Sequence, residues 1–74
     1  MKLYFENRFG EARQIAECKD DREVRLAIQN FINECNKHKS KDNQFKSYYT
    51  RTWEEDGKTW FDVGSHTEFF YTVK

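Results

Sequence analysis

The dipeptide Asp56-Gly57 stands between two runs of alternating aromatic and polar residues, and it constrains the fold more than any other feature. An Asp-Gly pair in this setting is the strongest local signal for a two-residue β-hairpin turn, because both turn positions need a positive φ. The turn sets Glu55 opposite Lys58, Trp53 opposite Trp60, Arg51 opposite Asp62 and Tyr49 opposite Gly64. Two of these pairs join opposite charges and one joins aromatic rings, and such pairs each stabilise a sheet by about 0.2–1 kcal/mol.

The two faces of this hairpin differ in polarity. The uncharged face carries Thr50, Thr52, Phe61 and Val63. The other face carries an Arg–Asp pair, which is costly to bury. We therefore expect a helix to cover the uncharged face and to leave the other one, the outer face, open.

A third strand follows the segment Gly64–Thr67. A three-residue bend sets Val63 opposite Phe69 and Phe61 opposite Tyr71. That register places Phe69, Tyr71 and Val73 in the core, and Glu68 and Phe70 on the outer face. A two-residue loop would turn the strand over and bury Glu68, so we prefer the first register.

The N-terminal third favours a hairpin followed by a helix. Residues 2–6 and 12–18 alternate like strands and are joined by a loop of about five residues, an ordinary length, although helix propensity leaves a short helix over residues 10–18 open. A helix from Asp21 to about Lys37 is capped by Asp20 with Glu23 three residues on. Its apolar stripe consists of Val24, Ala27, Ile28, Phe31, Ile32 and Cys35. The expected fold is α+β, a mostly antiparallel five-stranded sheet with one helix on one face (β-β-α-β-β-β).

Composition narrows the functional classes. Seventy-four residues make one domain, and the 13 basic residues balance the 13 acidic ones. This balance disfavours a strongly basic nucleic-acid binder and an acidic nucleic-acid mimic. Neither a membrane span of ~20 apolar residues nor a signal-peptide apolar region is recognisable. A cytoplasmic location is therefore expected, with Cys18 and Cys35 reduced.

The outer face is the predicted binding site. Its expected members are Tyr49, Arg51, Trp53, Trp60, Asp62 and Phe70, with His66 and Glu68 at the rim. An exposed aromatic patch with a polar rim is typical of an interaction surface, and Trp, Tyr and Arg dominate energetic hot spots. Protein binding is the leading interpretation, to a separate partner or in a homodimer.

The sequence gives less support to a metal site or to an enzymatic site. Cys35-x-x-His38 with Cys18 and His66 could assemble a zinc site, but Cys35 belongs to the apolar stripe of the helix, so we predict no metal and no cofactor. The adjacent Ser65-His66 pair does not supply the geometry of nucleophile, base and orienting group, so we predict no enzymatic activity.

A nucleic-acid interface is the alternative. The Lys37–Lys46 loop beside exposed aromatic rings has the ingredients of a single-strand platform, in which bases stack on rings and lysines follow phosphates. The balanced charge weakens this interpretation.

Two motifs carry a resemblance. Tyr49-x-Arg51-x-Trp53, followed by the run from Asp62 to Phe70, resembles small accessory proteins of phages and prophages of Gram-positive bacteria. The resemblance implies action in the host cytosol. It implies stoichiometric binding to a host protein, often a component of antiviral defence such as a CRISPR nuclease. Some proteins of this kind are sponges that sequester a signalling nucleotide.

Overall fold

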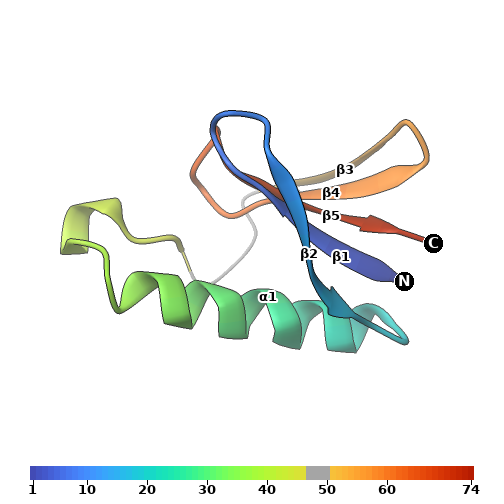
Figure 1. Ribbon diagram of the computed structural model, residues 1–74, viewed down its shortest axis with the longest axis horizontal. Coiled ribbons are helices and arrows are strands. Elements are labelled where there is room, and N and C mark those ends of the chain that lie inside the picture. Colours follow the sequence, from blue (N-terminus) through green and yellow to red (C-terminus); the bar gives the residue numbers. More distant parts are fainter. Residues whose placement is uncertain (47–50) are drawn as a thin grey trace.

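In the described part of the chain, five antiparallel strands form one sheet, and a single α-helix lies across one of its faces (Figure 1). The computed structural model describes residues 1–46 and 51–74. The elements are β1 (Lys2–Glu6), β2 (Ala12–Glu17), α1 (Asp21–Asn36), the 3-10 turn η1 (Lys41–Asn43), β3 (Arg51–Glu55), β4 (Lys58–Asp62) and β5 (Phe69–Val73). The strand order is β2-β1-β5-β4-β3. The predicted α+β fold and its β-β-α-β-β-β element order are confirmed.

The N-terminal segment forms the predicted hairpin, and the alternative helix over residues 10–18 is wrong. Asn7 organises the loop between β1 and β2, because its Oδ1 accepts hydrogen bonds from the backbone N–H of Phe9 (2.9 Å) and of Glu11 (3.0 Å). Gly10 adopts a φ of 80° in this turn, a conformation that glycine reaches without steric cost. These local contacts outweigh the modest helix propensity of the segment.

Helix α1 begins where its caps predict. Asp20 Oδ1 accepts from the Glu23 backbone N–H at 3.0 Å, and Glu23 Oε1 accepts from the Lys19 N–H at 2.8 Å. This is a capping box whose return bond is shifted by one residue. The buried helix residues are Val24, Ile28 and Ile32, with Ala27, Phe31 and Cys35 packed at the margin of the core. The predicted apolar stripe therefore faces the sheet.

The core lies between α1 and the sheet face turned toward it, which we call the inner face. Leu3 of β1 and Phe70 of β5 are wholly buried there. Rings of Phe5, Phe31 and Phe70 form a cluster in which each pair of centroids lies 4.7–5.5 Å apart. Aromatic pairs in such tilted and edge-to-face arrangements add about 0.5–1.5 kcal/mol beyond their buried area. The lean aliphatic content of the chain is thus compensated by phenylalanine.

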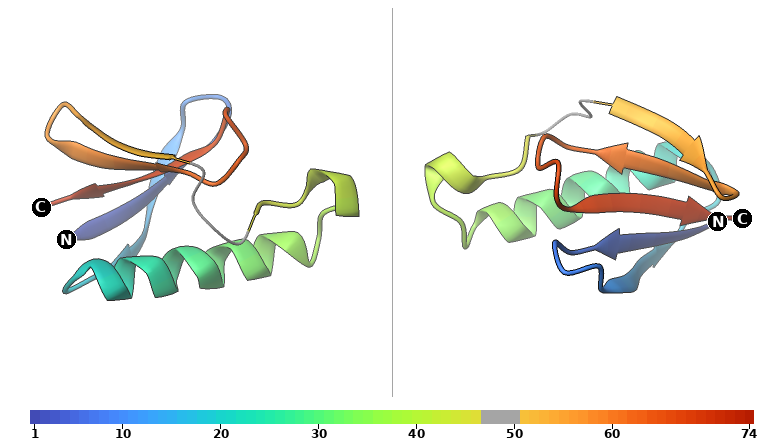
Figure 2. Two further views of the ribbon diagram at one scale, coloured as in Figure 1. Left: turned by 180° about the vertical axis from the view of Figure 1, so that it is seen from behind. Right: turned by 90° about the horizontal axis from the view of Figure 1, so that it is seen from above.

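The turn at Asp56-Gly57 matches its prediction. Asp56 and Gly57 both have positive φ, 55° and 74°. The strands pair Glu55 with Lys58, Trp53 with Trp60 and Arg51 with Asp62. The predicted pair of Tyr49 with Gly64, and the predicted position of Thr50, lie outside the described residues. The right-hand view of Figure 2 shows β3 at the edge of the sheet, with α1 behind the sheet on the side of the inner face.

The predicted register of β5 is wrong by one residue. Phe61 pairs with Phe70 and Trp60 with Tyr71, whereas the sequence favoured Phe61 opposite Tyr71. A slip of one residue turns every side chain to the opposite face. Phe70 is therefore a core residue with no exposed surface, and Phe69 and Tyr71 join the outer face.

The physical reason lies at Glu68. The sequence disfavours the observed register because that register directs Glu68 toward the helix side, where burial of a carboxylate is expected. Glu68 is only half-buried, because it lies before β5 begins and lines an open polar groove beyond the core. The helix side of the sheet is apolar under α1 and open to solvent before the start of β5, so the Glu68 carboxylate is not fully buried.

Candidate functional site on the outer sheet face

Four aromatic side chains cross the outer face in a line, one from each of four adjacent strands. We call Trp53, Trp60, Tyr71 and Tyr4 the aromatic row. They are direct cross-strand neighbours, so their order follows the order of the strands. Ring centroids lie 6.1 Å apart for Trp53–Trp60, 4.7 Å for Trp60–Tyr71 and 5.0 Å for Tyr71–Tyr4. The row continues from the edge strand β3 to the strand β1.

The rings stack against one another, and this decides what they present to solvent. The planes of Trp53 and Trp60, and those of Tyr4 and Tyr71, are inclined by only 9°. Neighbouring strands are about 4.8 Å apart, so stacked rings on successive strands cover each other's faces. Tyr71 is buried between its neighbours, and Trp53, Trp60 and Tyr4 are half-buried, so the rings leave part of their surface, including ring edges that carry the positive end of the aromatic quadrupole, open to solvent.

Two cations lie against this row. Lys58 Nζ is 4.7 Å from the Tyr71 centroid and 5.8 Å from that of Trp60. The Arg51 guanidinium carbon lies 4.7 Å from the Trp53 centroid. Cation–π contacts of this kind contribute about 0.5–1 kcal/mol at exposed sites. The two cations thereby shield part of the faces of Trp53, Trp60 and Tyr71.

Phe69 supports the row from one side. Its ring meets Trp53 and Trp60 edge-on, with centroid distances of 5.8 and 6.2 Å and planes inclined by 88° and 82°. Trp60 Nε1 is buried among these groups and has no hydrogen-bond partner within the described part of the chain. A buried donor without an acceptor costs about 1–3 kcal/mol. The packing contacts of the row therefore outweigh the free-energy cost of the unpaired Trp60 N–H group.

Asp62 lies on the predicted face but cannot contact a partner, because its side chain is completely buried. Its Oδ1 accepts hydrogen bonds from the backbone N–H of Gly64 (3.0 Å) and of His66 (3.2 Å). Its Oδ2 lies 2.8 Å from His66 Nδ1 and accepts from Arg51 Nε at 3.3 Å. The carboxylate thus ties the β4–β5 loop to the edge strand.

The charge state of Asp62 follows from these contacts. Burial alone raises the pKa of a carboxyl group. In Asp62 the hydrogen bonds from the His66 and Gly64 backbone N–H groups and from the His66 ring outweigh burial, so the pKa is lowered. The group is a structural anion and a poor proton donor at neutral pH.

The structure brings together only part of the predicted site. Arg51, Trp53 and Trp60 share the outer face as predicted, and His66, exposed over 68% of its side chain, joins them through Asp62. Phe70 belongs to the core, and Glu68 lies in the groove on the helix side. Tyr49 lies outside the described residues.

Sequence reasoning missed Tyr4, Tyr71, Phe69 and Lys58. Tyr4 alternates correctly within the run Lys2–Glu6, but only the strand order β1-β5-β4 brings it to the row. Tyr71 and Phe69 were missed because of the slipped register of β5. Lys58 was recognised only as the partner of Glu55.

The lysine-rich segment lies apart from the aromatic row. Residues 37–46 follow the C-terminal end of α1 (Figure 1). Lys37 Nζ contacts Glu34 Oε1 at 2.9 Å, and Lys39 Nζ lies 4.6 Å from the Phe45 centroid. Both ammonium groups are engaged locally, away from the rings on which bases would stack.

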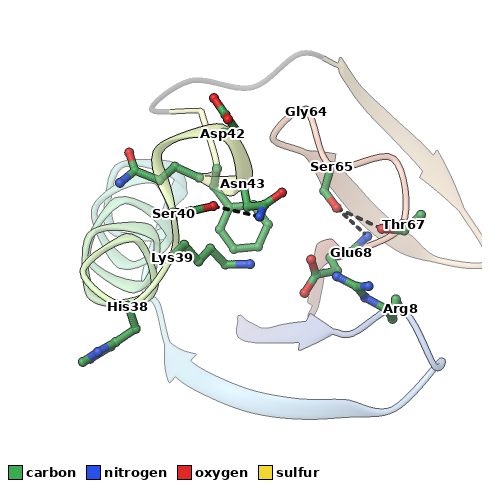
Figure 3. Close-up of a pocket in the computed structure, with 12 residues that line it drawn as sticks. Arg8, His38, Lys39, Ser40, Asp42, Asn43, Gly64, Ser65, Thr67 and Glu68 are labelled. Carbon is green, nitrogen blue, oxygen red and sulfur yellow. Dashed lines mark hydrogen bonds between the residues drawn. The ribbon is translucent and has the colours of Figure 1, made fainter.

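A polar groove of about 610 Å³ separates this segment from the β4–β5 loop (Figure 3). Arg8 and Lys39 bring positive charge to it, and Asp42 and Glu68 bring negative charge. Ser65 Oγ lies 3.1 Å from Thr67 Oγ1 and accepts from the Glu68 backbone N–H at 3.2 Å. The charges are mixed and the hydroxyl groups are used within the loop, so the groove does not form a site for one class of ion.

The cysteines do not form a metal site in the described structure. Cys18 is buried and Cys35 half-buried, and both are free thiols. Burial raises the pKa of each, which disfavours the thiolate that a metal would bind. The described residues contain no group of three or more His, Cys, Asp and Glu side chains placed to hold a metal ion.

Comparison with known proteins indicates neither a family nor a function. The chain matches no protein-family model, no curated protein and no solved structure. Within the described residues, no helix has both the length and the apolar character that crossing a membrane requires. Function is therefore inferred from the outer face itself.

Proposed function

We propose that this protein acts stoichiometrically by binding another protein through its outer sheet face. The observation that carries the proposal is the aromatic row with Arg51 and Lys58 on it, on a face that no described element covers. Rigid aromatic side chains and arginine provide much of the binding energy of protein interfaces. The stacking contacts hold these side chains in place before a partner arrives, which reduces the entropy lost on binding.

The ring geometry favours a protein over a nucleic acid. A single-strand platform needs ring faces on which bases can stack. In the aromatic row, the stacking of Tyr4 on Tyr71 and of Trp53 on Trp60, together with the cations over Trp53 and Tyr71, competes with stacking by a base. Of the lysines in residues 37–46, Lys37 and Lys39 are engaged beside the end of α1, and Lys46 packs against Gly64 in the β4–β5 loop. A nucleotide sponge would need the same open ring faces.

The chemistry of the face suggests the kind of surface it binds. Ring edges and cations attract carbonyl oxygens and carboxylates. We therefore expect a partner surface with exposed main-chain or acidic oxygens around a small apolar centre. The resemblance to small phage proteins supports a host protein in the cytosol, such as a nuclease of antiviral defence, as that partner.

The test is affinity capture from lysate of a Gram-positive host after nuclease treatment. The wild type is compared with the double variant Arg51→Ala/Trp53→Ala and with the control Leu26→Ala. Leu26 is 54% exposed on the helix, remote from the outer face. We expect one protein to be retained by the wild type and the control and lost by the double variant, while all three remain folded by circular dichroism.

Two results would contradict the proposal. One is equal capture of the same protein by the double variant, which would place the interface elsewhere. The other is material that is retained from untreated lysate but lost after nuclease treatment and at high salt. That outcome would indicate nucleic-acid binding, because phosphate contacts have a steep salt dependence.

A further inference from the structure

The edge strand β3 has a pattern of charge that complements itself. Arg51 and Glu55 lie on either side of Trp53 at equal distances, and all three side chains point to the outer face. An antiparallel copy of β3, centred on Trp53, would place Arg51 of each copy opposite Glu55 of the other. We propose that two copies of this protein associate by pairing their β3 strands about a two-fold axis at Trp53.

The hydrogen-bonding pattern of β3 permits this pairing. Glu55 and Lys58 close the two-residue turn as a hydrogen-bonded pair, and bonded and non-bonded pairs alternate along an antiparallel ladder. Arg51 and Trp53 therefore direct their N–H and C=O groups toward β4. Thr52 and Glu54 direct theirs away, to the side where no other described strand pairs. In the dimer, Thr52 of one copy and Glu54 of the other would exchange both hydrogen bonds.

This register also brings the outer-face side chains close together. Trp53 would face Trp53 of the second copy at a non-hydrogen-bonded position, where opposing side chains approach most closely. Each Arg51 uses Nε toward Asp62, so its two terminal nitrogens can reach Glu55 of the second copy. Opposite charges and aromatic pairs at facing positions stabilise a sheet.

The alternative register with its two-fold axis at Glu54, one residue closer to the turn, is less favourable for pairing. A two-fold axis there would set Glu54 directly opposite its own copy, and facing like charges are destabilising. Centring on Trp53 instead matches each charge of the outer face with its opposite.

The two edges of the sheet differ in a way that singles out β3. The pairing of β1 with β2 shifts register between Leu3 and Tyr4, and such bulges twist an edge away from further pairing. The pairing of β3 with β4 runs without a shift from Arg51 to Glu55. The regular edge is thus the one with the self-complementary charges.

Dimerisation would double the proposed binding surface. The aromatic row ends at Trp53, so two rows would meet at the axis and form one line across both copies. The pairing stands on β3 alone and does not depend on the proposed partner binding. It is small in area, so we expect a dimer that dissociates on dilution.

The first test is sedimentation equilibrium over a range of about 10 μM to 1 mM, where mass action populates a weak dimer. The wild type is expected to approach twice its 9.1 kDa mass at the upper end. Thr52→Pro removes the outward N–H and should be monomeric, since proline is tolerated at this edge position. The matched control Thr52→Val keeps the N–H and should dimerise like the wild type. A monomeric wild type, or a Thr52→Pro variant that dimerises equally, would overturn the proposal.

A cross-linking pair keeps the test decisive even if the proline variant does not fold. Trp53→Cys places two thiols face to face across the axis, within disulfide range, whereas Glu55→Cys places the thiols of the two copies about 14 Å apart along the strand direction. Both variants carry Cys35→Ala, which leaves only the buried Cys18. Mild oxidation should link Trp53→Cys into dimers much faster than Glu55→Cys. Equal rates would refute the register.

Discussion

Asp62→Asn is the substitution that most directly tests how the outer face is held in place. The natural carboxylate accepts two backbone N–H bonds at Oδ1 and contacts Arg51 and His66 at Oδ2. Asparagine can retain the two backbone bonds through its single carbonyl oxygen. Its amide NH₂ would replace the second oxygen and donate where the carboxylate accepts.

The expected cost follows from which contacts are lost. The bonds to Gly64 and His66 N–H survive, and the bond to Arg51 does not. The His66 ring keeps its contact only if Nδ1 is unprotonated and accepts from the amide. Arg51 and His66 are exposed over 59% and 68% of their side chains, so water can satisfy both once released. The lost Arg51 bond costs near the lower end of the range for charged groups and the altered His66 contact costs less, so we expect a total of about 1–3 kcal/mol. For a domain of this size that lowers the Tm by about 4–8 °C per kcal/mol.

The pH dependence supplies a sharper signature than the size of the loss. The pKa of Asp62 is lowered in the folded state, so the unfolded chain takes up a proton first as the pH falls. Its stabilising effect is fully present above the unfolded pKa of about 3.9 and is lost as the pH falls through the folded pKa. Urea unfolding of wild type and Asp62→Asn at pH 7 and near pH 2.5–3 should show a difference that shrinks at acid pH.

A constant difference across this range would refute the reasoning. It would mean that the penalty comes from steric or dipolar mismatch of the amide and not from loss of a bound anion. Glu34→Gln is the matched control. The pKa of Glu34 is also lowered, by its contact with Lys37, but the side chain is exposed and its loss should have little effect at either pH.

Two further substitutions test the fold. Phe70→Ala should destabilise the protein by about 3–5 kcal/mol in urea unfolding, because it empties a wholly buried site. The control Phe9→Ala changes a side chain that is 80% exposed and should alter stability by less than about 0.5 kcal/mol. Equal losses in the two variants would support the register predicted from the sequence, in which Phe70 lies on the outer face. Asp20→Ala should remove the helix cap at a cost of about 1 kcal/mol, and an unchanged midpoint in thermal unfolding would show that the cap bond is not formed in solution.

Local interactions are what the sequence revealed most reliably. The Asp56-Gly57 turn fixed the pairing of Trp53 with Trp60 because a two-residue hairpin permits only one register. The helix was predictable from Asp20 and from the spacing of its apolar stripe. Both elements are specified by residues within a few positions of each other, so no knowledge of the rest of the chain was needed.

Contacts between distant segments were not predictable in the same way. The register of β5 depends on the path of the loop around Asp62, and hydrogen bonds to one side chain determine that path. From the sequence alone, the observed register would bury Glu68, and only the full structure shows that this position is half-exposed. Tyr4 could not be assigned to the site, because the position of β1 beside β5 has no local signature.

The placement of β1 has a consequence for how the chain folds. Its residues pair with β5, so two strands far apart in the sequence must meet before the middle of the sheet can close. The two hairpins need only nearby partners and can form early, whereas the joining step brings together distant segments, and such long-range pairing is slow. We therefore expect two unjoined hairpins with exposed phenylalanine side chains to precede the folded state, and the core to be completed only when β1 and β5 pair.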